Sequence, residues 1–365
     1  MIMHENIKVF ILTNTLLHGG AEKQSVLLAK NLKDEYSTTI IVYYGEKYHK
    51  RLIDEVNKNK LNIIFLKGNH LKKIIYLYNL FKQNKDSIIF SYLLTTNFLN
   101  AIIGSLAGVK FKIGGIRNSI IPYFKLKLQK ILHNHFLTAT ISNNYSGQKN
   151  LIKKGFNRNK CFCIHNGIEI KEAIINRDHR TNIEILTVGR FVPAKDYYTA
   201  LKAIFLLKKM LANSKHYITY TIIGFGSEEN KIKSWIEYFN LKDTVSLIIN
   251  PNNLNNYYQK ADIYFSTSLY EGLSNSIIEA MEFSLPIVAT NVGDNEYLII
   301  EGQSGFLLPI KDAEGMSSKL KLLVDNPKQR VEFGHNAYRH LKNNFLEEIF
   351  KQKYINFINN LFDEC

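Results

Sequence analysis

The chain has 365 residues, which is too long for one ordinary hydrophobic core and predicts two domains of about 150–200 residues each. With 45% apolar and 22% charged residues, its composition is that of a globular protein and excludes the collagenous and low-complexity classes. The formal net charge of +15 is uneven, because residues 1–180 hold 28 Lys and Arg against 11 Asp and Glu, whereas residues 181–365 hold 19 against 21.

Short apolar runs alternate with longer amphipathic runs, which predicts a parallel sheet wound with helices. The first half predicts strands at KVFILTN, TTIIVYY, NIIFL, SIIFSYLL, FKIGGI and TATIS, with helices at residues 21–32, 71–82 and 121–133. The second half predicts strands at IEILTVGR, YTIIGFG, VSLII, DIYFSTS and PIVAT, and a helical region from Pro327 to its end. The polar stretch KEAIINRDHRTN at 171–182 is the predicted linker. We therefore expect two similar doubly wound α/β domains.

No targeting or anchoring segment is expected. The apolar run after Glu5 has the length of a strand, and no later run reaches about 18 uninterrupted apolar residues. Cys161, Cys163 and Cys365 form an odd set without metal-binding spacing, which favours a reduced setting. These features predict a soluble cytoplasmic protein.

A helix is predicted directly after the strand DIYFSTS. Gly272 permits a tight turn, and Ser274 or Asn275 can cap the helix that follows. Its buried stripe would consist of Ile277, Ile278 and Met281.

Two carboxylates flank this turn. Glu271 lies at the carboxyl end of the strand, and Glu279 lies about two helical turns further, on a different face from the isoleucines. The N–H groups of Gly272, Leu273 and Ser274 point the same way as Glu271, so the loop suits a ligand with hydroxyls and an anionic group. The structural alternative is that Glu279 pairs with a nearby lysine and Glu271 caps a turn.

Two cations follow the strand ILTVG. Arg190 lies at its end and Lys195 lies five residues later, in GRFVPAKD. Because Arg binds phosphates bidentately and Lys supplies a compact charge, the two suit a pyrophosphate. Surface ion pairs with Asp196 or Glu184 are the alternative.

Two glycines follow the first strand in LLHGGAEKQ. Gly19 and Gly20 precede a predicted helix and are typical of a loop that approaches phosphate closely, since only glycine lets the backbone come so near. The pattern is not the G-x-G-x-x-G fingerprint of dinucleotide sites. In GFGSEEN at 224–230, packing of a tight turn is the expected role.

Taken in order, the segments GGAEK, HNGIE, VGRFVPAKD, IIGFGSEE, EGLSNSIIEAM, PIVATNVGDNEYLI and GFLLP resemble the retaining GT-B glycosyltransferases, specifically glycosyltransferase family four. The resemblance covers nearly the whole chain. It implies an α/β fold of two Rossmann-like, doubly wound parallel-sheet domains that face each other across a cleft. We place these domains at residues 1–172 and 173–344, and we expect a C-terminal helix at about 345–365 to pack back on the first.

The resemblance also implies a role for each candidate residue. Arg190 and Lys195 would hold the donor diphosphate and stabilise the charge that develops as the nucleotide leaves. Glu271 would bond hydroxyls of the transferred sugar, and Glu279 would bond the ribose hydroxyls. The amides of residues 272–274 would help at phosphate and sugar, and Gly20 would approach from the opposite domain. No metal and no other cofactor is implied, because the two cations replace a D-x-D carboxylate pair.

The sequence departs from the family at one position. Many members carry a histidine after the strand that corresponds to FKIGGI, and here Arg117 takes that place. A guanidinium there can bond the donor sugar or a phosphate of the acceptor, but it cannot act as a base. Since transfer in this family is thought to use the leaving phosphate as base, activity is still expected. A catalytic Arg117 and a structural ion pair remain alternatives, and His18 is a lesser candidate.

The N-terminal half carries the features expected of an acceptor side. It contains no acidic residue between Asp86 and Glu169, which implies a negatively charged partner. Lys125, Lys127 and Lys130 alternate with apolar residues at roughly helical spacing, and residues 69–85 do likewise. Such helices suit the anionic inner face of the cytoplasmic membrane, with a polyprenyl-diphosphate-linked glycan as acceptor. A generally lysine-rich composition with outward-facing lysines is the alternative.

The leading function is a retaining glycosyltransferase that moves a sugar from a UDP-linked hexose or N-acetylhexosamine to a lipid-linked or surface-polysaccharide precursor, as in lipopolysaccharide or capsule synthesis. A sugar-nucleotide 2-epimerase of the same architecture is one alternative. A non-enzymatic protein that binds an anionic polymer through the basic half is another. Since no nucleic-acid-binding module can be recognised, nucleic acid is not an expected partner.

Overall fold

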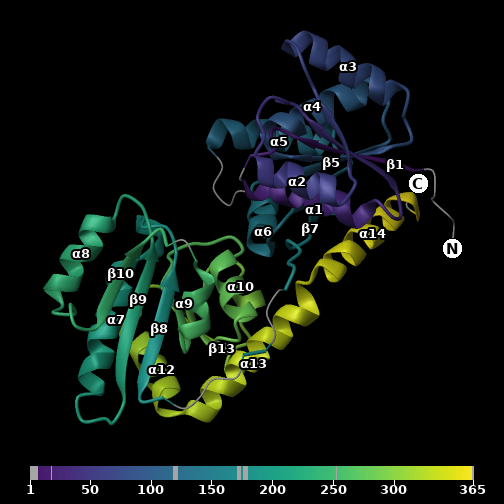
Figure 1. Ribbon diagram of the computed structural model, residues 1–365. Helices are drawn as coiled ribbons and strands as arrows, with labels where there is room; N and C mark the ends of the chain where they lie inside the picture. Colours follow the sequence, from purple (N-terminus) through teal and green to yellow (C-terminus); the bar gives the residue numbers. More distant parts are fainter. Residues whose placement is uncertain are drawn as a thin grey trace. The chain divides into compact units, whose positions relative to one another are not determined.

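The computed structural model describes residues 7–17, 19–117, 122–170, 174–175, 180–251 and 253–363. The chain forms two compact units. Unit 1 comprises Met1–Ile168 together with Phe345–Cys365, and unit 2 comprises Glu169–Asn344. Each unit is an α/β structure with its own parallel sheet (Figure 1). Most of the predicted linker, and also His18 and Cys365, lie outside the described residues.

In its described part, unit 1 contains a sheet of seven strands in the order β3-β2-β1-β4-β5-β6-β7, with every neighbouring pair parallel. The strands are β1 (Lys8–Thr13), β2 (Ser37–Val42), β3 (Asn62–Phe65), β4 (Ile88–Tyr92), β5 (Phe111–Ile116), β6 (Ala139–Ser142) and β7 (Cys161–Cys163). The central strands β1 and β4 are almost entirely buried, as their unbroken apolar runs predict for a sheet covered on both faces.

Helices connect these strands and cover the sheet. They are α1 (Gly20–Leu32), α2 (Lys50–Lys58), α3 (His70–Lys82), α4 (Leu93–Leu106), α5 (Tyr123–His135), α6 (Tyr145–Lys153) and α14 (Glu347–Asp363). The last of these comes from the end of the chain and lies beside α1 (Figure 1). Its Phe350, Tyr354 and Ile358 are buried in the core of unit 1. Glu347 secures its first turn by accepting bonds from Lys30 and Asn31 of α1.

Unit 2 contains a sheet of six strands among its described residues, in the order β10-β9-β8-β11-β12-β13, again with every neighbouring pair parallel. The strands are β8 (Asn182–Val188), β9 (Tyr217–Gly224), β10 (Val245–Ile249), β11 (Ile263–Ser266), β12 (Ile287–Thr290) and β13 (Gly305–Leu308). The helices are α7 (Tyr197–Met210), α8 (Glu229–Tyr238), α9 (Asn255–Lys260), α10 (Asn275–Glu282), α11 (Asn295–Leu298), α12 (Ala313–Asp325) and α13 (Pro327–Asn344). Helices α7 and α12 pack together, α7 also against β9 and α12 against β12 and β13, and they enclose the main core of this unit (Figure 1).

The expected fold class, two doubly wound parallel-sheet domains, is confirmed. The predicted strands occur, but the stretch SIIFSYLL was wrong in part, because Leu93 and Leu94 already belong to α4. The first helical residue, Leu93, has a positive φ of 74°, so the backbone turns abruptly from strand to helix at a point that an apolar run cannot reveal. The described part of the chain has no helix that is both long and apolar enough to span a bilayer.

Candidate functional site

The loops that follow β8 and β11 lie at one edge of the sheet in unit 2. The two strands are neighbours and run parallel, so their carboxyl ends meet at this edge. Backbone and side-chain bonds hold the loops together: Leu269 N–H donates to Ala194 O over 2.8 Å, and the Thr267 hydroxyl lies 2.9 Å from the carbonyl oxygens of Lys195 and Asp196. The predicted residues on the two loops are therefore brought into one site.

Lys195 and Glu271 form an ion pair across these loops. Their side chains retain 20% and 15% of their exposure, so the pair is largely shielded but still accessible. Ser268 supports the carboxylate by donating its hydroxyl to the same Glu271 oxygen over 2.7 Å. The predicted alternative of a Lys195–Asp196 pair is wrong, because Asp196 caps α7 through Thr199 N–H and hydroxyl.

The turn after Glu271 is held by the loop that follows β12. Asp294 N–H donates to Gly272 O over 2.9 Å. A Cβ on Gly293 would lie 2.6 Å from the carbonyl oxygens of both Glu271 and Gly272, and its φ is +60°. Only glycine fits there without displacing the turn, so Gly293 fixes the position of the Glu271 backbone.

Helix α10 begins at this turn, with Ser274 as the N-cap residue and no side-chain cap bond. Leu273 and Ser274 continue the turn from Gly272, and Ser274 is buried. The predicted buried stripe is confirmed by the burial of Ile277, Ile278 and Met281.

Glu279 lies on a different face of α10 from that buried stripe. The Tyr258 hydroxyl of α9 donates to its Oε2 over 2.8 Å. Tyr258 is buried and its ring stacks on Phe283 at a centroid distance of 5.4 Å. Burial raises the pKa of Tyr258 well above its ordinary value, and the neighbouring Tyr264 and Glu279 act in the same direction, so this hydroxyl remains a proton donor. The sequence alone does not indicate Tyr258, because nothing in NNYYQK distinguishes it from its neighbours.

Arg190 is exposed on the loop after β8. The backbone beneath it is fixed by the buried Tyr197, whose hydroxyl donates to Gly189 O over 3.0 Å. Desolvation raises the pKa of Tyr197, with further contributions from Tyr220, Tyr264 and the Glu271 carboxylate. Arg190 is thus an exposed residue on a fixed stretch of backbone at the same sheet edge as Lys195.

In unit 1, the predicted glycine loop forms the start of α1. Gly19 is the N-cap residue, and Gly20 has no atom within 4 Å of the place a Cβ would occupy. The Glu22 carboxylate folds back over this turn, where it accepts a bond of 2.8 Å from the Thr15 hydroxyl and would clash with any Cβ on Gly19. A side chain at position 19 would have to displace the Glu22 carboxylate, whereas among the described residues position 20 has open space beside the helix N-terminus.

Arg117 follows β5 and lies over the ring of Tyr92, with its guanidinium carbon 4.5 Å from the ring centroid. Its Nη1 donates to Asn166 Oδ1. The predicted structural ion pair for Arg117 is wrong within the described structure, since its contacts there are an aromatic face and an amide. Its Nε is buried and has no hydrogen-bond partner within the described part of the chain.

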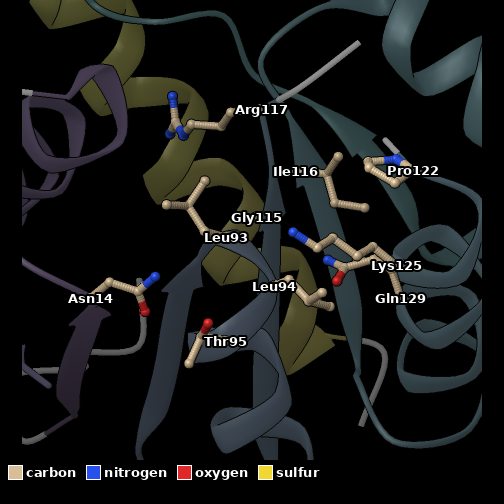
Figure 2. Close-up of a pocket in the computed structure, with 10 residues that line it drawn as sticks. All are labelled: Asn14, Leu93, Leu94, Thr95, Gly115, Ile116, Arg117, Pro122, Lys125 and Gln129. Atoms are coloured by element: carbon tan, nitrogen blue, oxygen red, sulfur yellow. The ribbon is translucent and has the colours of Figure 1, made fainter. Parts of the chain in front are cut away.

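The three lysines of α5 do not form one patch. Lys125 lines a pocket of unit 1 together with Arg117 (Figure 2). Lys127 is exposed, and the Lys130 amine lies over Gly155, 2.5 Å from the place a Cβ would occupy. Lys125 lies two and five residues from the other two lysines and therefore on a different face of the helix, whereas Lys127 and Lys130 are three apart and lie near the same face.

Known proteins of the same fold include glycosyltransferases. The family described as Glycosyl transferases group 1 matches residues 168–340, which contain Arg190, Lys195, Glu271 and Glu279. An uncharacterised glycosyltransferase of Haemophilus influenzae is 26% identical over 94% of this chain and 97% of its own length.

Two further relatives carry names that specify chemistry. An alpha-1,4-N-acetyl-D-galactosaminyltransferase of Campylobacter jejuni, named for a PP-undecaprenol-linked glycan, is 25% identical over 92% of this chain and 94% of its own length. The crystal structure of HepE from Anabaena in complex with UDP superposes with a TM-score of 0.80 and 16% identity, over 97% of this chain and all of that one. Residues 168–340 of this chain match the group 1 glycosyl transferases, and the chain is a glycosyltransferase of the GT-B fold.

Proposed function

We propose that the protein is a retaining glycosyltransferase that moves a sugar from a UDP-sugar, a hexose or N-acetylhexosamine, to a lipid-linked or surface-polysaccharide glycan. One observation carries this proposal: Lys195, Glu271 and Ser268 are connected at the sheet edge that also presents Arg190 and the start of α10. Such an edge collects the groups that bind phosphates and those that bind hydroxyls.

The diphosphate of the donor is assigned to Arg190 and Lys195. Negative charge grows on the leaving nucleotide during transfer, so cations held in place before the reaction lower the barrier without reorganising. The Lys195–Glu271 ion pair holds the Lys195 ammonium in place before the donor binds, because each charge fixes the position of the other. The ligand then gains an ammonium whose position is already determined.

The hydroxyls of the donor are assigned to the two carboxylates. Glu271 accepts from the transferred sugar and Glu279 accepts from the ribose, with Tyr258 orienting the second carboxylate. The N–H groups of Gly272, Leu273 and Ser274 support the phosphate or sugar at the turn. In this scheme, the leaving phosphate removes the acceptor proton, so that the new bond forms on the face from which the nucleotide departs.

The acceptor and the membrane are assigned to unit 1. Phe124, Leu128 and Ile131 of α5 are exposed at 83%, 38% and 44%, and Lys127 lies among them at helical spacing. On α3, Leu71 and Ile75 are exposed at 65% and 50% beside the exposed Lys72. Apolar side chains next to lysines are what an anionic bilayer surface binds, at about 1 kcal/mol for each cation near it. We place the protein at the inner face of the cytoplasmic membrane on this ground.

Donor hydrolysis tests the function without an acceptor. Slow release of UDP from a UDP-sugar is expected in the wild type, with a loss of at least about 100-fold in Lys195→Ala and in Glu271→Ala, since each removes one charged contact in the transition state. Lys202→Ala is the matched control, because Lys202 pairs with Glu314 on the surface of α7, away from these loops. Full turnover in the folded Lys195 and Glu271 variants would refute the assignment.

A further inference from the structure

Unit 1 contains a pocket at the carboxyl ends of its central strands. Its volume is about 280 Å³. The loop after β1 contributes Asn14, and the first turn of α4 contributes Leu93, Leu94 and Thr95. The remaining lining residues come from β5, the segment after it and α5: Gly115, Ile116, Arg117, Pro122, Lys125 and Gln129. Figure 2 shows Asn14 on one side of the pocket and Lys125 and Gln129 on the other.

Three of the lining residues carry side-chain polar atoms that have no hydrogen-bond partner among the described residues. They are Asn14 Oδ1, Gln129 Oε1 and Arg117 Nε, each buried. Gln129 is only 4% exposed, and its amide points into the pocket (Figure 2). Buried polar groups normally have a hydrogen-bond partner, so three unpaired polar atoms around one pocket indicate a ligand with several donors and acceptors. Sugar hydroxyls are such groups, because each donates one bond and accepts others.

The charge of the pocket has one sign. Lys125 and Arg117 supply cations, and none of the described lining residues is acidic. The whole sequence between Asp86 and Glu169 lacks carboxylates, so the chain offers no nearby acid from that segment to neutralise Lys125. The first turn of α4 adds N–H groups without a side-chain cap. An anionic substituent on the ligand matches this environment.

The size of the pocket limits the ligand to one unit. Sites for drug-sized molecules span about 300–1,000 Å³, and this pocket lies just below that range. Its apolar wall, formed by Leu93, Leu94, Ile116 and Pro122, suits the carbon face of a sugar ring. The pocket therefore accommodates one sugar ring, and the rest of a longer glycan would extend outside it.

We propose that this pocket is an acceptor subsite for one anionic sugar unit, with Asn14 and Gln129 bonding its hydroxyls and Lys125 bonding its phosphate or carboxylate. The inference rests on the proposed function and specifies the substrate class. Two sources share this chemistry: a sugar 1-phosphate, as at the reducing end of a lipid-linked glycan, and a uronic acid within a polysaccharide. Gln129 and Lys125 are then the residues that determine acceptor specificity.

Ligand-observed NMR on the full-length protein tests the subsite with four probes: N-acetylglucosamine 1-phosphate, galacturonic acid, N-acetylglucosamine and inorganic phosphate. One of the two anionic sugars is expected to bind at least about ten-fold more tightly than the neutral sugar and than phosphate. Stronger binding of the first probe indicates a lipid-linked source, and stronger binding of the second indicates an acidic polysaccharide. Equal binding of inorganic phosphate, or no binding of either anionic sugar, would overturn the proposal.

Variants then locate the binding. Lys125→Gln is expected to lower the affinity for the anionic sugar to that for the neutral sugar. Gln129→Leu is expected to lower the affinity for both sugars. Lys154→Gln is the matched control, since Lys154 is an exposed lysine of the same acid-free segment that does not line the pocket. Lys125 is exposed, so its variant keeps the test valid even where the buried Gln129→Leu fails to fold. Equal affinities in the Lys125 and Lys154 variants would place the ligand elsewhere.

Donor hydrolysis by the wild type separates this inference from the proposed function. If UDP is released from UDP-sugars but neither anionic sugar binds the pocket, the acceptor subsite is wrong and the glycosyltransferase assignment stands. If no nucleotide sugar is hydrolysed or bound, the proposed function fails first.

Discussion

At the scale of single residues, Tyr258 connects the core of unit 2 to Glu279, the residue proposed to bind the ribose of the nucleotide. Tyr258→Phe removes the only hydroxyl of this side chain, and with it the bond to Glu279 Oε2. Hydrogen bonds to charged groups contribute about 1.5–3 kcal/mol, so we expect UDP to bind roughly ten-fold more weakly. Isothermal titration calorimetry with UDP measures this change.

Tyr264→Phe controls for the loss of a buried hydroxyl. Tyr264 is stacked against Tyr258, but its hydroxyl donates to Val188 O over 3.2 Å. We expect a similar decrease in stability with UDP affinity retained. If both variants bind UDP equally well, Tyr258 does not orient Glu279 for the nucleotide.

Cys161 is expected to make the free energy of unfolding depend on pH in the alkaline range. Burial raises the pKa of its thiol from 9.0 to about 11. Between these values the unfolded chain has lost the proton that the folded chain retains, so the unfolded state binds fewer protons and stability falls as pH rises through this window. The loss approaches about 1.4 kcal/mol per pH unit for one group.

Chemical denaturation at pH 8, 9, 10 and 11 measures this effect by comparing the wild type with Cys161→Ala. Ionisation of buried tyrosines also destabilises the protein at high pH, but both proteins contain these tyrosines. The difference in free energy of unfolding between wild type and variant therefore reports on the thiol. We expect the variant to lose less stability than the wild type between pH 9 and 11. Parallel curves would show that the Cys161 pKa is not raised by folding.

The sequence predicted where several site residues lie, but not how they are connected. A turn after the strand containing Phe265 placed Glu271 at the sheet edge, because strand length and Gly272 are local signals. The pairing of Lys195 with Glu271, and not with the adjacent Asp196, depends on two strands that are neighbours in space and distant in sequence. No local pattern contains that information.

At the scale of elements, α14 shows how the end of the chain stabilises unit 1. Phe350 is 2% exposed, and its ring centroid lies 4.7 Å from that of Tyr354. It also packs closely on Gly167, where an added Cβ would lie 2.8 Å from the Cβ of Phe350. Phe350→Ala is therefore expected to lower the free energy of unfolding of unit 1 by about 3–5 kcal/mol. Urea denaturation followed by circular dichroism measures it.

Phe124→Ala is the matched control for that experiment. Phe124 is the same residue type on a helix of the same unit, but it is 83% exposed. Its truncation should change stability by no more than about 0.5 kcal/mol. Comparable losses in both variants would mean that α14 does not form part of the core.

Some helices were predicted closely and others were not, including the fourteen-residue helices α4 and α7. The helix expected at 71–82 is α3 within one residue. In contrast, α2 and α6 were not predicted, because each has nine residues and few buried side chains. The three-residue strand β7 becomes a strand only through its pairing with β6.

At the scale of the whole molecule, the two units have separate hydrophobic cores. One cluster spans β8, β9, α7 and α12 of unit 2, and another spans β1, β4, α1 and α14 of unit 1. Because each core is complete within its own unit, we expect two transitions in a calorimetric scan of the full-length protein.

UDP identifies the transition of unit 2. A ligand that binds only the folded state at 100 times its Kd stabilises it by about 2.7 kcal/mol, so saturating UDP should raise one Tm and leave the other unchanged. The Phe350→Ala variant should lower the other Tm, since Phe350 lies in the core of unit 1. The two perturbations therefore have to act on different transitions if Lys195, Glu271 and Glu279 bind the nucleotide. A scan in which UDP raises the same transition that Phe350→Ala lowers would place the nucleotide in unit 1, and a single transition would show that the two cores unfold together.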